Sequence, residues 1–140
     1  MDSFPRDPNH WLRRLSPDEW IRAALAELNR AERAWEHGDG RAGAAGVKRA
    51  AGMALNAALI VEPDETWGRS YTEHVEALSH DHRVPEAVRA ASRRVVEARP
   101  PSGPVVSLRT PKAHAQLVEA ARDVIAHAWV VVKRHEAAGG

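Results

Sequence analysis

The chain has 140 residues, and 20 Lys and Arg against 19 Asp and Glu give it a formal charge of +1 at pH 7. A chain of this length fits one domain, and a charge so close to zero excludes an overall field that would attract nucleic acid or membrane. The absence of cysteine excludes disulfides, thiolate metal ligands and thiol catalysis. The N-terminus lacks a signal-peptide pattern and no uncharged apolar run reaches about 18 residues, so we expect a soluble cytoplasmic protein.

The composition favours helices over sheet. Alanine is abundant, aromatic residues are few, and no segment alternates between polar and apolar residues with a period of two. We therefore predict an all-α fold, an up-and-down antiparallel bundle of about five helices. The prediction places one domain over residues 1–140, with a polar leader at 1–15, a loop at 99–109 and a frayed tail at 137–140.

The first helix is predicted to begin at Ser16-Pro17-Asp18-Glu19. Ser16 supplies the N-cap, Pro17 suits the first helical position, and Glu19 completes a capping box. Apolar residues then recur every three or four positions and form one face. They are Ile21, Ala24, Leu25, Leu28, Ala31 and Trp35. The turn Gly38-Asp39-Gly40 ends this helix.

The second helix is predicted over residues 41–60 and is ended by Pro63. Its inward residues are mostly small, namely Val47, Ala51, Ala54, Leu55, Ala58 and Leu59. Gly43, Gly46 and Gly52 each weaken a helix by roughly 1 kcal/mol relative to alanine, so they predict places where another backbone comes close. This segment is therefore expected to be the tightly packed central helix.

Two shorter helices are predicted next. Ser70-Tyr71-Thr72-Glu73 forms a second capping box and opens a helix that ends near His80. Val84-Pro85 opens another, which runs to about Ala98. The proline-rich stretch at 99–104 breaks that helix and predicts a loop.

The closing helix is predicted from Thr110-Pro111 to about Glu136. Its main apolar stripe consists of Leu117, Ala121, Val124, Ala128 and Val131. A second set, Val118, Ile125, Trp129 and Val132, widens this stripe. Because the total width exceeds what one neighbouring helix needs, it predicts a second buried face and hence a subunit interface.

This order of elements resembles the HEPN family of helical bundles, in which two long antiparallel helices are followed by shorter helices and a long closing helix. The resemblance covers nearly the whole chain. The matching features are Trp11-Leu12, the Gly38-Asp39-Gly40 turn, the small-residue run from Val47 to Leu59, Trp67-Gly68-Arg69-Ser70, Val84-Pro85-Glu86 and the Arg99-Pro100-Pro101 loop. These are apolar and turn signals, so they speak for the fold more than for an activity.

The chain departs from the family pattern at polar positions. Members often carry Gln-Ala-x-Glu and later Leu-Lys in the second helix, whereas residues 48–56 of this chain lack that glutamate and lysine. Arg69 stands where a histidine commonly precedes the short helix, and Pro100 stands where the late loop commonly has tyrosine. A retained core with changed polar groups indicates a scaffold whose original site is altered.

The segment Arg122-Asp123-Val124-Ile125-Ala126-His127 reproduces the Arg-x4-His signature of ribonuclease members. The resemblance implies that His127 would act on the ribose 2′-hydroxyl or the leaving group, and that Arg122 would steady the phosphate charge without a metal. Two positions five apart on a straight helix point about 140° from each other, so the pair would have to act across a dimer interface. The competing interpretation is that Arg122 is solvated and His127 flanks the core.

Two further sets of polar residues are candidate binding sites. Arg93, Arg94 and Arg99 are candidate RNA or phosphate contacts, although arginine pairs on helices usually form a solvated face. The histidines at positions 74, 80 and 82, with Asp81, suit a metal chemically, but their spacing does not. We predict no metal site and no cofactor.

The predicted function is a HEPN-like dimerising binding or accessory module. As the resemblance implies, its partner would be of nucleotidyltransferase type or a defence or toxin–antitoxin component, with RNA as a further candidate ligand. The alternative is a metal-independent endoribonuclease that uses Arg122 and His127 across a dimer interface. A small-ligand pocket between helices is a third possibility.

Overall fold

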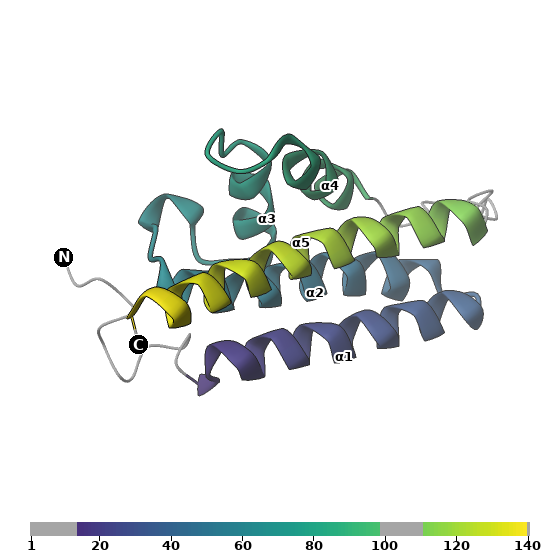
Figure 1. Cartoon of the computed structure of the whole chain (residues 1–140). Coiled ribbons are helices and arrows are strands. Elements are labelled where there is room, and N and C mark those ends of the chain that lie inside the picture. Colours follow the sequence, from purple (N-terminus) through teal and green to yellow (C-terminus); the bar gives the residue numbers. More distant parts are fainter. Residues whose placement is uncertain (1–13, 99–110, 140) are drawn as a thin grey trace.

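The computed structural model describes residues 14–98 and 111–139, and every regular element within them is helical (Figure 1). The elements are α1 (Pro17–Glu36), α2 (Gly40–Val61), the short 3-10 helix η3 (Glu65–Trp67), α3 (Tyr71–Ser79), α4 (Glu86–Glu97) and α5 (Pro111–Gly139). The predicted all-α bundle is confirmed to this extent. The predicted leader, up to residue 13, and the 99–109 loop lie outside the described residues.

The helix starts follow the predicted caps. In α1, the backbone N–H of Glu19 donates to Ser16 Oγ at 3.2 Å, and Glu19 Oε1 accepts from the Ser16 N–H at 2.9 Å. In α3, the Glu73 N–H donates to Ser70 Oγ at 3.1 Å. α5 continues to Gly139, beyond the end predicted at Glu136.

A tight turn joins α1 and α2. Gly38 has a φ of +82°, a left-handed conformation that favours glycine, and Asp39 caps α2 by accepting from the Ala42 N–H at 3.0 Å. The two helices then pack so closely that a Cβ added at Gly46 would lie 2.8 Å from Ala31 Cβ. The glycines of α2 therefore serve the close approach that their positions predict.

Ion pairs at the ends of the bundle establish the direction of α5. Its Arg122 and Lys133 pair with Glu32 and Asp18 of α1, so these two helices are antiparallel. Its Arg134 pairs with Glu62 at the C-terminal end of α2, so α5 runs in the same direction as α2 (Figure 1). The predicted up-and-down antiparallel arrangement therefore does not hold for α2 and α5, because α3 and α4 carry the chain back between them.

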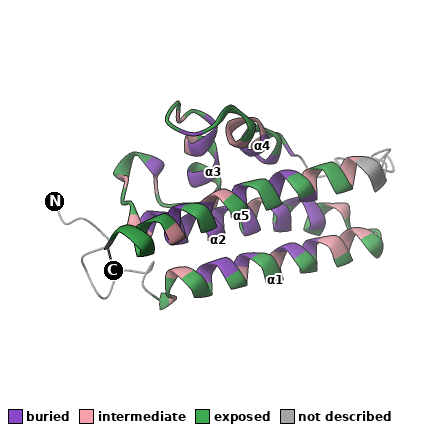
Figure 2. Cartoon of the chain, in the orientation of Figure 1, coloured by how far each residue is buried: buried purple, intermediate pink, exposed green. Residues whose placement is uncertain are grey.

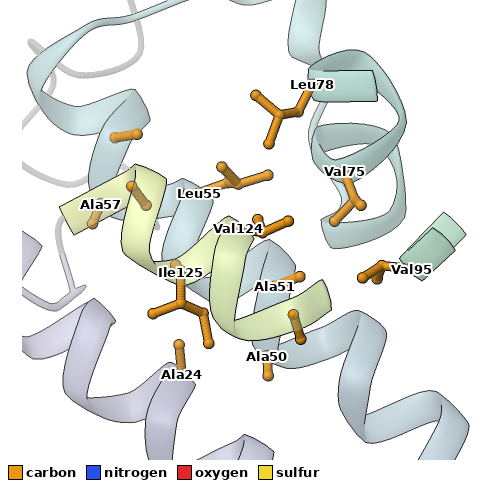
Figure 3. Close-up of a cluster of buried hydrophobic side chains, with 14 of the residues drawn as sticks. Ala24, Ala50, Ala51, Leu55, Ala57, Val75, Leu78, Val95, Val124 and Ile125 are labelled. Carbon is orange, nitrogen blue, oxygen red and sulfur yellow. The ribbon is translucent and has the colours of Figure 1, made fainter. Parts of the chain in front are cut away.

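The core surrounds α2, which is buried along most of its length (Figure 2). Leu55 of α2 and Val124 of α5 meet the apolar side chains of α3 and α4 (Figure 3). By length and composition α2 could also cross a membrane, but most of it is buried inside the bundle, as in the core helix of a soluble protein.

The wide apolar stripe of α5 is mostly buried by the other helices of the same chain. Val118, Ile125 and Val132 are buried, because α5 packs against α1 as well as against α2 and α4. Ile125, for example, points toward Ala24 of α1 (Figure 3). The stripe width therefore does not require a subunit interface. Trp129 is the member of this set that remains exposed.

Candidate functional site

The two residues of the Arg-x4-His segment lie on different flanks of α5. Arg122 faces α1, where Nη2 lies 3.2 Å from Glu32 Oε1, and its Nη1 donates to Glu119 Oε1 at 2.8 Å. The guanidinium is thus engaged by two carboxylates at the surface. These ion pairs hold the Arg122 side chain on the side of α5 away from His127.

His127 borders a cavity of about 350 Å³ where α5 meets the α2–η3 connection and the α3–α4 loop. Burial lowers the pKa of His127, and the positive charge of Arg134 lowers it further. The imidazole is therefore mostly neutral at pH 7. Within one chain, Arg122 and His127 do not share a ligand, as their spacing predicts.

The rim of this cavity is charged. Arg83 Nε and Nη2 donate to the two carboxylate oxygens of Asp81, each at 2.9 Å, and Nη2 also lies 3.3 Å from Asp64 Oδ2. Hydrogen bonds from Arg83 hold the pKa of the Asp81 carboxyl below its usual range. Arg134 pairs with Glu62 at 2.8 Å. The apolar part of the lining includes Ala58, Trp67, Val84 and Val131.

Sequence reasoning missed this cavity. Its polar residues come from the end of α2, the start of η3, the α3–α4 loop and α5, and no spacing pattern connects them. The signal for it in the sequence is Asp81 among histidines, residue types that also suit a metal. Among the described residues, no group of three or more His, Asp or Glu side chains is placed to hold a metal ion.

The other predicted site residues are scattered. Arg93 and Arg94 are exposed on α4, and Arg93 lies 3.8 Å from Glu86. Arg99 lies outside the described residues. His74 is fully buried, and its Nδ1 lies 2.9 Å from the carbonyl oxygen of Trp67, which gives this histidine a structural role in positioning η3 against α3.

A second candidate surface is the outward face of α5, which we define as Arg122, Asp123, Ala126, Trp129, Val130 and Lys133. At the centre of this face, Trp129 is 48% exposed and Val130 is 51% exposed. Figure 2 shows exposed segments along α5. Lys133 Nζ lies 5.7 Å from the centre of the Trp129 ring. Large exposed apolar side chains rimmed by charges are typical of an interaction surface.

Leu25 of α1 extends this apolar centre. It lies seven residues from both Asp18 and Glu32, so the three side chains share one flank of α1. Since Asp18 pairs with Lys133 and Glu32 with Arg122, Leu25 lies level with Trp129 between the two ion pairs. Leu25 is itself 43% exposed.

Comparison of the chain with known protein families, with curated proteins and with solved structures finds no match.

Proposed function

We propose that this protein is a HEPN-like binding or accessory module that associates with a second copy of itself through the outward face of α5. The observation that carries the proposal is Trp129, half exposed in the middle of α5 and flanked along the helix by charged residues. The resemblance to HEPN proteins extends the proposal to a cytoplasmic role beside a nucleotidyltransferase-type or toxin–antitoxin partner.

The charges on this face suit an antiparallel pair of α5 helices related by a two-fold axis. If the axis passes near Ala128, Asp123 lies opposite Lys133 of the second copy, because each is five residues from the centre. The small Ala126 then lies opposite Val130 of the second copy, which lets the helices approach. Lys133 Nζ already contacts Asp18 and Glu136 of its own chain, at 3.3 and 3.2 Å, and an ammonium group has a third N–H for Asp123 of the second copy.

The endoribonuclease alternative needs a different register. Arg122 of one copy meets His127 of the other only if the axis passes between Val124 and Ile125. Trp129 would then lie level with Ala120, which is buried, and Asp123 would lie level with Ala126. That register leaves the apolar centre uncovered and the charges unpaired, so the binding function has the better support.

Charge reversal tests the proposed dimer. Asp123→Lys places two lysines opposite each other in a homodimer, and Lys133→Glu places two carboxylates opposite each other. Either variant alone should be monomeric in sedimentation or light-scattering measurements at concentrations where the wild type is a dimer. A mixture of the two variants should restore a dimer, because each of the two contacts in the mixed pair then brings one lysine against one carboxylate. Glu76→Lys, on the exposed surface of α3, is the matched control.

A second variant tests the apolar centre. Trp129→Gln should abolish the dimer while leaving the helical circular-dichroism spectrum unchanged, because Trp129 is half exposed in the single chain. A wild type that stays monomeric across about a hundredfold range of concentration, or a Trp129→Gln protein that still dimerises normally, would contradict the proposed function.

A further inference from the structure

The cavity beside His127 has the size and lining of a small-molecule site. Its volume of about 350 Å³ lies at the lower end of the range for ligand pockets. Trp67 and Val131 contribute apolar surface, and Asp81, whose side chain is only 11% exposed, contributes a carboxylate at the rim. The cavity lies outside the outward face of α5, so ligand binding there does not depend on dimerisation.

The charges around the cavity favour a cation. Three carboxylates, those of Glu62, Asp64 and Asp81, face two guanidinium groups, those of Arg83 and Arg134. One negative charge is therefore in excess. Because both guanidinium groups are already held by these carboxylates, an anionic ligand would have to break existing ion pairs to bind.

Two hydrogen-bond acceptors at the cavity have no partner among the described residues. Arg134 and His135 both approach Glu62 Oε2, and no described side chain bonds Oε1. The ring of His127 likewise forms no hydrogen bond with a described residue, and as a neutral imidazole it offers one nitrogen as an acceptor. Asp81 has further lone pairs beyond those that Arg83 uses.

We infer that this cavity binds a small ligand that carries a primary ammonium group on a short apolar body. An ammonium group is a cation that donates hydrogen bonds, and the cavity lining offers acceptors for it at Glu62, Asp81 and His127. The apolar body would lie against Trp67 and Val131. This assigns His127 and Asp81 to ligand binding in a way that involves neither RNA nor Arg122.

Butylamine is a suitable probe, with butanol and butyrate as the neutral and anionic counterparts. In the ¹⁵N-labelled full chain, butylamine should shift the Trp67 indole resonance in a saturable manner, and butanol and butyrate should not. Glu62→Gln removes the excess charge and should weaken butylamine at least about tenfold, because hydrogen bonds to charged groups are strong. Glu97→Gln, an exposed acid of α4 outside the cavity lining, is the matched control.

A second variant guards against a change in folding. Ala58→Leu adds volume to the cavity lining without altering its charges, so it should also weaken butylamine; because Ala58 is buried in α2, circular dichroism and urea unfolding of the variant are measured alongside. Failure of butylamine to shift Trp67, an equal response to butyrate, or unchanged affinity in both Glu62→Gln and Ala58→Leu would overturn the inference.

Discussion

The guanidinium of Arg122 lies 3.2 Å from the carboxylate of Glu32, 90 residues earlier in the chain. This contact joins α5 to α1 and turns Arg122 away from the flank on which His127 lies. An arginine held by two carboxylates at the surface is a poor partner for a phosphate, since binding would require it to leave both. The contact therefore argues against Arg122 as a phosphate-binding residue of a ribonuclease site.

We expect no RNA cleavage that depends on this pair. Purified wild-type protein in the presence of a chelator should leave single-stranded RNA as intact as the Arg122→Ala and His127→Ala variants do, with the products resolved by gel electrophoresis. Cleavage by the wild type that is lost in both variants would establish the endoribonuclease and remove the binding function as the better proposal.

Gly52→Ala should destabilise the fold. A Cβ at Gly52 would lie 2.2 Å from Tyr71 Cβ and 2.6 Å from Tyr71 Cα, so α3 would have to move away from α2. We expect a loss of about 1 to 3 kcal/mol in the free energy of unfolding, measured by urea denaturation, despite the better helix propensity of alanine. Ala45→Gly, at an exposed position of the same helix, should show only the propensity cost of about 1 kcal/mol. Equal or greater stability of Gly52→Ala would show that the helices are not so close.

Asn56→Leu should stabilise the protein. Asn56 is fully buried in α2, and neither atom of its amide has a hydrogen-bond partner among the described residues. Replacing it with an apolar side chain of similar size removes a desolvated amide, so the free energy of unfolding should rise by about 1 kcal/mol. Asn29→Leu, at an exposed position of α1, should change it by less than about 0.5 kcal/mol. A marked loss of stability in Asn56→Leu would mean that the amide is bonded in solution.

Stability should fall as the pH drops below about 6.5. Burial lowers the pKa of His74 and of His127, so the unfolded chain binds protons more readily than the folded one does in this range. By linkage, the free energy of unfolding then decreases as the pH falls through the unfolded pKa, until the folded pKa is reached. Urea unfolding at about pH 7.5 and about pH 5.5 measures the change.

His74→Leu isolates the contribution of the buried histidine. It should lower stability at the higher pH, because the bond to the Trp67 carbonyl is lost, and it should also reduce the dependence on pH. A pH dependence equal to that of the wild type would show that His74 does not titrate with folding.

Local sequence signals determined the helices. Ser16 with Glu19, Ser70 with Glu73, and the Gly38 turn act through bonds and backbone preferences within four residues, so the starts of α1 and α3 and the end of α1 could be predicted without a structure. The periodic apolar residues likewise predicted the burial of Leu28, Leu55 and Val124, but Leu25, predicted on the same inward face of α1, is exposed.

Only the tertiary structure decided the direction of α5, the exposure of Trp129 and the cavity at His127. Each depends on contacts between residues far apart in the chain, such as Arg134 with Glu62. The identity of an apolar residue on a helix does not indicate which neighbouring helix will cover it. Periodicity shows how much apolar surface a helix has to bury, whereas the packing of all the helices together determines which part remains exposed.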